Sequence, residues 1–272
     1  MLRKKLFVLP LMVIALVAGL SVSTTQTADA QTLERIVSSG ELRVGMSGNQ
    51  APYNAVSRTG DMIGLDVDLA NILAGAFGVN LNIVVKPFPQ LLPALQAGEV
   101  DIIISGMAIT AERTVDVSFV GPYLLTGNSI LTNSTTLAAI DSAGQINRAD
   151  LRLAALENST SHRFVQRFLP EAQLTTTQNY DDGVAMVLSD EVDAMVADMS
   201  VCLLSMLRYP GQGLATLNQP LALEPAGIAM LPGDPQLENL IRNFLWAFEG
   251  TGLLEQLRKK WLEDGSWIAA LP

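Results

Sequence analysis

Short apolar runs rich in branched residues alternate along this chain with segments whose apolar residues recur at helical spacing. Strands are predicted over 41–46, 81–85 and 102–104, and helices over 66–74 and 90–96. Each strand–helix–strand unit indicates a right-handed crossover between parallel strands. The chain is therefore predicted to be an α/β protein, in which helices cover a mostly parallel sheet.

The alternation pauses at 126–129, where polar and small residues gather, and then begins again. A second series follows, with strands predicted over 151–156, 174–177 and 194–197, helices over 161–168 and 182–188, a turn-rich stretch at 220–226 and a strand at 227–231. We therefore predict a discontinuous first lobe, 31–127 and 223–272, with a second lobe, 128–222, inserted into it. The connecting segments near 126–130 and 220–226 would form a two-strand hinge.

The first 30 residues are typical of a secretory signal peptide. A basic head at 3–5 precedes an apolar run over 6–20, and a small-x-small cleavage site ends at Ala30. The run is shorter than a membrane span, which disfavours the alternative of an uncleaved anchor. We therefore expect an exported, periplasmic protein that begins at Gln31.

The cysteine content and the net charge further restrict the class of protein and its partners. Cys202 is the only cysteine, so the chain forms no intramolecular disulfide, and its apolar neighbours predict a buried, inert thiol. An exported chain without disulfides needs a hydrophobic core, which a 49% apolar composition can supply. The formal net charge of −10 argues against nucleic acid and anionic lipid as partners.

One predicted strand is followed by small residues and then by an arginine. The run 102–104 is followed by small residues, and Thr110 and Arg113 can begin the next helical turn. Small residues let backbone N–H groups approach a ligand, and an arginine offers a planar fork of donors that matches a carboxylate. Open α/β sheets place their ligands at the carboxyl ends of strands. The pattern favours a carboxylate clamp, and the alternative is a surface arginine after a core strand.

Five motifs in one order identify a family. They are Gly64–Ala70 (GLDVDLA), Pro93–Asp101 (PALQAGEVD), Ser105–Arg113 (SGMAITAER), Gly121–Tyr123 (GPY) and Val192–Asp198 (VDAMVAD). On these motifs, from about Leu33 to Trp261, the chain resembles the bacterial periplasmic solute-binding proteins of the polar amino-acid type, the family 3 receptors of ABC importers. The resemblance implies the type II periplasmic-binding-protein fold, two α/β lobes that close on a ligand about a two-strand hinge.

The resemblance also implies a function and partners. The receptor would capture an amino acid or a related small carboxylate-bearing amine, and deliver it to a membrane permease with a cytoplasmic ATPase. Such a receptor needs no cofactor, and we expect a monomer.

Roles for individual residues follow from the same motifs. Arg113 would pair with the α-carboxylate of the ligand, aided by the backbone N–H groups of Gly106 and Ala108. Asp198 would accept the α-ammonium from the second lobe, or instead cap the following helix, or do both. When opposite lobes hold opposite ends of a zwitterion, ligand binding favours the closed state.

The side-chain pocket is predicted from four further positions. Phe88 aligns with an aromatic residue that packs on the ligand, with a plain core phenylalanine as the alternative. Gln50 falls where many relatives carry the other aromatic residue of the pocket. After the strand over 151–156, Leu156 could line the pocket and Thr160 could hydrogen-bond the ligand carboxylate.

Three departures from the family pattern leave the ligand open. Gln50 weakens the expected stacking on the ligand, and Ala108 lacks a hydroxyl whose hydrogen bond contributes about 1 kcal/mol. Asn158 replaces a common glycine, which asparagine tolerates where the backbone is left-handed.

We expect binding rather than catalysis, because no catalytic pattern stands out. His162 is the only histidine and is expected near an exposed helix N-terminus, so the sequence offers no Cys/His metal cluster and no Cys–His pair. The alternative is a periplasmic cyclohexadienyl (prephenate/arogenate) dehydratase on the same scaffold, with Glu157 as the acid that we would nominate.

Overall fold

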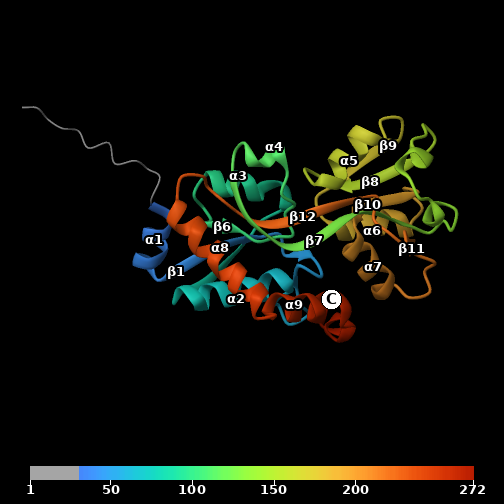
Figure 1. Cartoon of the computed structure of the whole chain (residues 1–272). Coiled ribbons are helices and arrows are strands. Elements are labelled where there is room, and N and C mark those ends of the chain that lie inside the picture. Colours follow the sequence, from blue (N-terminus) through green and yellow to red (C-terminus); the bar gives the residue numbers. More distant parts are fainter. Residues whose placement is uncertain (1–30) are drawn as a thin grey trace, which may run out of the picture.

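A computed structural model describes residues 31–272, so the predicted signal peptide, residues 1–30, lies outside the described residues. These residues form two α/β lobes, and two long strands, β7 (Ser118–Thr132) and β12 (Ala222–Met230), run from one lobe into the other (Figure 1). No helix within 31–272 combines the length and the apolarity that a membrane span requires.

The first lobe contains a sheet whose central strands are parallel. Strand β1 pairs in parallel with β5 and β6, and β6 pairs antiparallel with the far end of β12. The strands of this lobe are β1 (Glu41–Met46), β2 (Asn49–Gln50), β3 (Asn54–Val56), β4 (Met62–Ile63), β5 (Asn80–Val85) and β6 (Ile102–Ile103), and its helices are α1 (Gln31–Ser39), α2 (Leu65–Phe77), α3 (Leu91–Gln96), α4 (Ala111–Thr114), α8 (Pro235–Gly250) and α9 (Leu253–Arg258).

The second lobe extends the same sheet. Strand β10 pairs antiparallel with the end of β7 and in parallel with β8, which in turn pairs in parallel with β9. The strands of this lobe are β8 (Arg152–Leu156), β9 (Gln173–Thr177), β10 (Ala194–Asp198) and β11 (Ala215–Thr216), and its helices are α5 (Thr160–Phe168), α6 (Tyr180–Leu188) and α7 (Met199–Arg208). The sheet order β5-β1-β6-β12-β7-β10-β8-β9 therefore continues through both lobes.

Most local predictions are confirmed because they rest on local periodicity. Helix α2 contains the predicted span 66–74 and ends at Gly78, which adopts the left-handed conformation of a C-cap. The Cys202 thiol is fully buried, as its apolar neighbours predict, and burial raises its pKa to about 12.

The turn prediction for 220–226 is wrong from Ala222 onward, whereas the prediction that this segment forms one strand of a two-strand connection between the lobes is confirmed. Residues from Ala222 onward form the first half of β12, and they pair with residues 124–128 of β7. Partner strands hold this segment extended although its own residues, which include Pro225, favour turns. The connection between the lobes is thus a continuous antiparallel ribbon.

A small apolar cluster joins the lobes away from this ribbon. Leu271, near the C-terminus, is buried against Ala55 of β3 and Leu204 of α7. The backbone N–H of Arg58 donates to the carbonyl of Ala270 at 2.9 Å, which anchors the C-terminal segment to the first lobe.

Candidate functional site

Arg113 lies on the short helix α4, immediately after the strand β6 and its small residues. The Thr110 hydroxyl accepts a hydrogen bond from the Arg113 backbone N–H at 3.2 Å and so caps the helix. The Arg113 side chain is only 4% exposed. Its two terminal nitrogens donate to the carbonyl oxygens of Ala108 at 2.8 Å and Asn158 at 2.9 Å, whereas its buried Nε has no hydrogen-bond partner.

No carboxylate within 31–272 forms an ion pair with this guanidinium, although the negative charges of Glu224 and Glu112 act on it from a distance. Burial lowers the pKa of Arg113 to about 10, and the nearby Arg163 contributes in the same direction, so the group stays protonated at neutral pH. The Phe88 ring lies 5.8 Å from the guanidinium carbon, within the range of a cation–π contact. A buried cation with an unused donor is complementary to an incoming carboxylate.

The backbone beside Arg113 supplies one donor that is in use and one that is not. The Gly106 N–H donates to the Tyr123 hydroxyl at 3.2 Å, so it is occupied in this conformation. Gly106 has a φ of +55°, and a side chain there would meet the Tyr53 ring at 2.7 Å. No residue within 31–272 accepts a hydrogen bond from the Ala108 N–H, which leaves that donor for a ligand.

A buried hydrogen-bond network holds the loop that carries Gly106 in place. The Tyr123 hydroxyl donates to Asp66 on α2 at 2.7 Å, and the other Asp66 oxygen accepts from the Asn54 side chain at 2.9 Å. Burial raises the pKa of Asp66 to about 6, although both hydrogen bonds oppose the shift. The network links the motif Gly64–Ala70 to the loop that carries Gly106, and so positions the clamp.

Asp198 ends strand β10 at the N-terminus of α7. Its carboxylate makes no capping hydrogen bond to α7, which removes the role that a helix cap would give it. The side chain is 6% exposed, and the Thr126 hydroxyl donates to it at 3.3 Å. Burial and, next, the charge of Glu224 raise its pKa to about 7. Within 31–272 no lysine or arginine forms an ion pair with it.

Glu224 is a site residue that sequence analysis missed. It lies on β12, in the segment predicted as turns, and its carboxylate accepts from the Asn128 amide at 2.6 Å and the Thr160 hydroxyl at 2.5 Å. The available signal was the polar pair Thr126 and Asn128 on the partner strand β7, because residues two positions apart share one face of a strand.

The remaining predicted pocket residues lie around the same junction. Gln50, on β2, is buried, and its amide oxygen accepts a hydrogen bond from Ser47 at 3.4 Å. Leu156 ends β8 within the apolar core, and Thr160 begins α5. Asn158 has a φ of +57°, the left-handed conformation in which asparagine can replace glycine.

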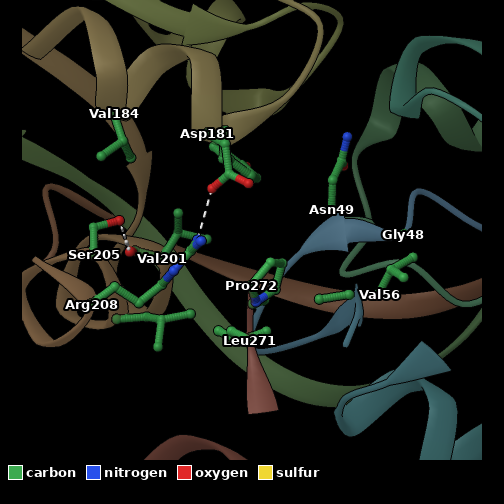
Figure 2. Close-up of a pocket in the computed structure, with 14 residues that line it drawn as sticks. Gly48, Asn49, Val56, Asp181, Val184, Val201, Ser205, Arg208, Leu271 and Pro272 are labelled. Atoms are coloured by element: carbon green, nitrogen blue, oxygen red, sulfur yellow. Dashed lines mark hydrogen bonds and ion pairs between the residues drawn. The ribbon is translucent and has the colours of Figure 1, made fainter. Parts of the chain in front are cut away.

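Among the hollows between the lobes, two contain charged side chains from both sides or from the junction, and a third, lined largely by apolar residues, lies between α7 and the segment 261–268. A groove of about 690 Å³ runs between α4 and α5 and is lined by Glu112, Thr160, Arg163 and Glu224 among others. A smaller cavity of about 150 Å³ lies between β2–β3, α6–α7 and the C-terminus (Figure 2). Its charged groups pair with each other, Arg208 with Asp181 at 2.8 Å. The groove by α4 and α5 also contains an ion pair, but it is lined in addition by Glu224, whose hydrogen-bond donors are both neutral, so it is the better candidate for a charged ligand. Arg113 and Asp198 line neither hollow.

Comparison with known proteins now decides the family. The family model of bacterial extracellular solute-binding proteins, family 3, matches residues 42–264. The chain belongs to this family. Solved structures of amino acid-binding proteins share the two-lobe fold described above.

Relatives within this family include both a receptor and an enzyme. The chain is 27% identical to a cyclohexadienyl dehydratase of Pseudomonas aeruginosa, covering 90% of this chain and 91% of the relative. It is 25% identical to an ABC transporter arginine-binding protein of Escherichia coli, covering 81% and 90%. A solved ancestral amino acid-binding protein, described as a precursor of cyclohexadienyl dehydratase, is 34% identical with a TM-score of 0.78, covering 85% and 99%.

Proposed function

We propose that this family 3 protein is a periplasmic receptor that binds an amino acid between its lobes and delivers it to an ABC permease in the inner membrane. The predicted signal peptide and the amino acid-binding relatives support this assignment. We further propose that binding is not followed by turnover, that the receptor acts as a monomer, and that the ligand lies between Arg113 and Asp198.

The observation that carries the proposal is the pair of buried, unpaired charges. Arg113 has an unused Nε and no carboxylate partner within 31–272, and Asp198 has no cationic partner there. Unpaired charges are costly to bury, so a native protein retains them where a ligand completes them. An α-amino acid brings a carboxylate and an ammonium on one carbon and thereby satisfies both.

Contacts between the lobes support closure as part of binding. The Arg113 guanidinium of α4 donates to the Asn158 carbonyl of the second lobe, and Arg163 of α5 pairs with Glu112 of α4 at 3.1 Å. We propose that β7 and β12 form the hinge between the lobe 31–127 with 223–272 and the lobe 128–222. A ligand that contacts both lobes then shifts the protein toward the closed state.

Calorimetric titration of the purified protein with the common amino acids tests the proposal. We expect saturable binding of at least one of them, and we expect Arg113→Ala to weaken it by about 2–5 kcal/mol, because the ligand carboxylate loses its buried partner. Arg242→Ala on the exposed side of α8 is the matched control and should bind normally. Near wild-type affinity of Arg113→Ala would refute the clamp.

A dehydratase remains the second candidate because one relative carries that name. Glu157, the acid nominated for this chemistry, accepts a hydrogen bond from Gln178 instead of standing free in the groove. The Nδ1 of His162 accepts from the Asn158 backbone N–H at 3.2 Å, which leaves Nε2 as the ring nitrogen available for such chemistry. Incubation with prephenate separates the two functions: product formation would select the enzyme, and amino acid binding without turnover would select the receptor.

A further inference from the structure

Arg113, Asp198 and Glu224 meet where the lobes join. None of the three forms an ion pair with another residue of 31–272. At the rim of the groove, Glu112 and Arg163 pair with each other and cancel. When Asp198 is ionised, as it is opposite a bound ammonium, the remaining three groups leave one negative charge in excess. A zwitterionic ligand has no net charge, so closing the lobes around it would bury that excess, which is unfavourable.

The two carboxylates flank one face of strand β7. Asp198 is paired in register with Asn128, and Glu224 with Thr126, so all four side chains lie on the same face of the sheet. Thr126 donates to Asp198 from one side, and Asn128 donates to Glu224 from the other. Since adjacent strands are about 4.8 Å apart, the backbones of β10 and β12, which flank β7, are separated by roughly 10 Å.

The hydrogen bonds of Glu224 leave it able to accept from a cation. Its two present donors, the Asn128 amide and the Thr160 hydroxyl, are both neutral. Each carboxylate oxygen retains a further lone pair. The Thr160 hydroxyl already donates its hydrogen to Glu224, so it can only accept a hydrogen bond from a ligand. Glu224 and Thr160 therefore present acceptors that line the groove between α4 and α5.

We propose that Glu224 determines specificity by binding a second cationic group, so that the ligand is an amino acid with a side-chain ammonium or guanidinium. The inference rests on the proposed function and extends it to the ligand class. Asp198 and Glu224 would hold the two cationic ends, and the four-carbon stem of a lysine-like side chain would span β7, which separates the two carboxylates on one face of the sheet. One such ligand brings the buried charge to zero.

Isosteric ligand pairs test this proposal by calorimetric titration. Arginine and citrulline have nearly the same shape but differ by one charge. Lysine and norleucine share the same four-carbon side chain, and only lysine has the terminal ammonium. We expect the wild-type protein to prefer the cationic member of each pair by at least about tenfold, the range of one buried charge-assisted contact. Glu224→Gln should reduce this preference by about tenfold while changing the affinity for citrulline by less than about threefold.

Glu191→Gln is the matched control, because it removes the same charge from the second lobe at an exposed side chain. It should keep the wild-type preference. The wild-type comparison needs no variant, so the ligand class is decided even where Glu224→Gln does not fold. Tight binding of neutral or acidic amino acids with rejection of arginine and lysine would overturn the inference and leave the receptor function standing. Binding of no amino acid at all would overturn both.

Discussion

Replacing Asp198 with asparagine should change stability and binding in opposite directions. The Asp198 pKa is raised from an ordinary value of 3.8 to about 7, chiefly by burial. A shift of about three pKa units corresponds to about 4 kcal/mol at the usual 1.36 kcal/mol per unit. Because the folded-state pKa lies above the unfolded one, protonation stabilises the fold fully below about pH 3.8, and this contribution is lost as the pH rises through about 7.

Asp198→Asn removes this titration. Without ligand at pH 8, the variant should therefore be more stable than the wild type by up to about 4 kcal/mol, or a melting temperature higher by about 10 °C in a chain of this size. The advantage should disappear near pH 4, where wild-type Asp198 is protonated. Ligand affinity should fall by about 2–5 kcal/mol, because the α-ammonium loses its buried counter-charge.

Urea unfolding followed by tryptophan fluorescence at pH 8, 6 and 4 measures the stability, and calorimetric titration measures the affinity. Asp141→Asn makes the same chemical change at an exposed residue of the second lobe and should leave both quantities unaltered. A variant that is less stable than the wild type at pH 8, or that binds as tightly, would refute the assignment of Asp198 as an unpaired carboxylate awaiting a cation.

Two further predictions concern the hinge and the core. Gly127→Ala places a methyl group 2.1 Å from the Ala222 carbonyl oxygen, so β7 and β12 must separate. We expect the free energy of unfolding, measured in urea, to fall by about 1–3 kcal/mol. Gly144→Ala, with open space around it, should leave this free energy unchanged. Burial raises the pKa of Cys202 to about 12, so a thiol reagent at pH 8 should label it only as fast as the protein unfolds, and rapid labelling of the native protein would contradict its burial.

Elements defined by local periodicity were predictable from the sequence. Helix α2 has apolar residues at helical spacing and Gly78 at its end, and β10 is an apolar run closed by Asp198. The same holds for Arg113, because a strand, small residues and a helix-capping Thr110 follow one another within a dozen positions. In each case the residues that determine the local structure are neighbours in sequence.

Only the candidate site residues that belong to a sequence motif were predictable. Arg113 and Asp198 each follow a strand, and the sequence places both near carboxyl ends of strands. Their state was not predictable: whether Asp198 caps α7, and whether the Gly106 N–H is free, depends on Tyr123 and on neighbours from other elements. Burial and unmet hydrogen bonds are properties of the assembled site.

By itself, then, the sequence determined the α/β class and the two-lobe fold, and it singled out Arg113 and Asp198 as the proposed contacts of a zwitterion. The tertiary structure decided the extended course of β12 and the place of Glu224, which bonds to Asn128 from 96 positions away. The physical reason is that periodicity acts over a few residues. Strand pairing and the desolvation of charges, in contrast, depend on groups that only folding brings together.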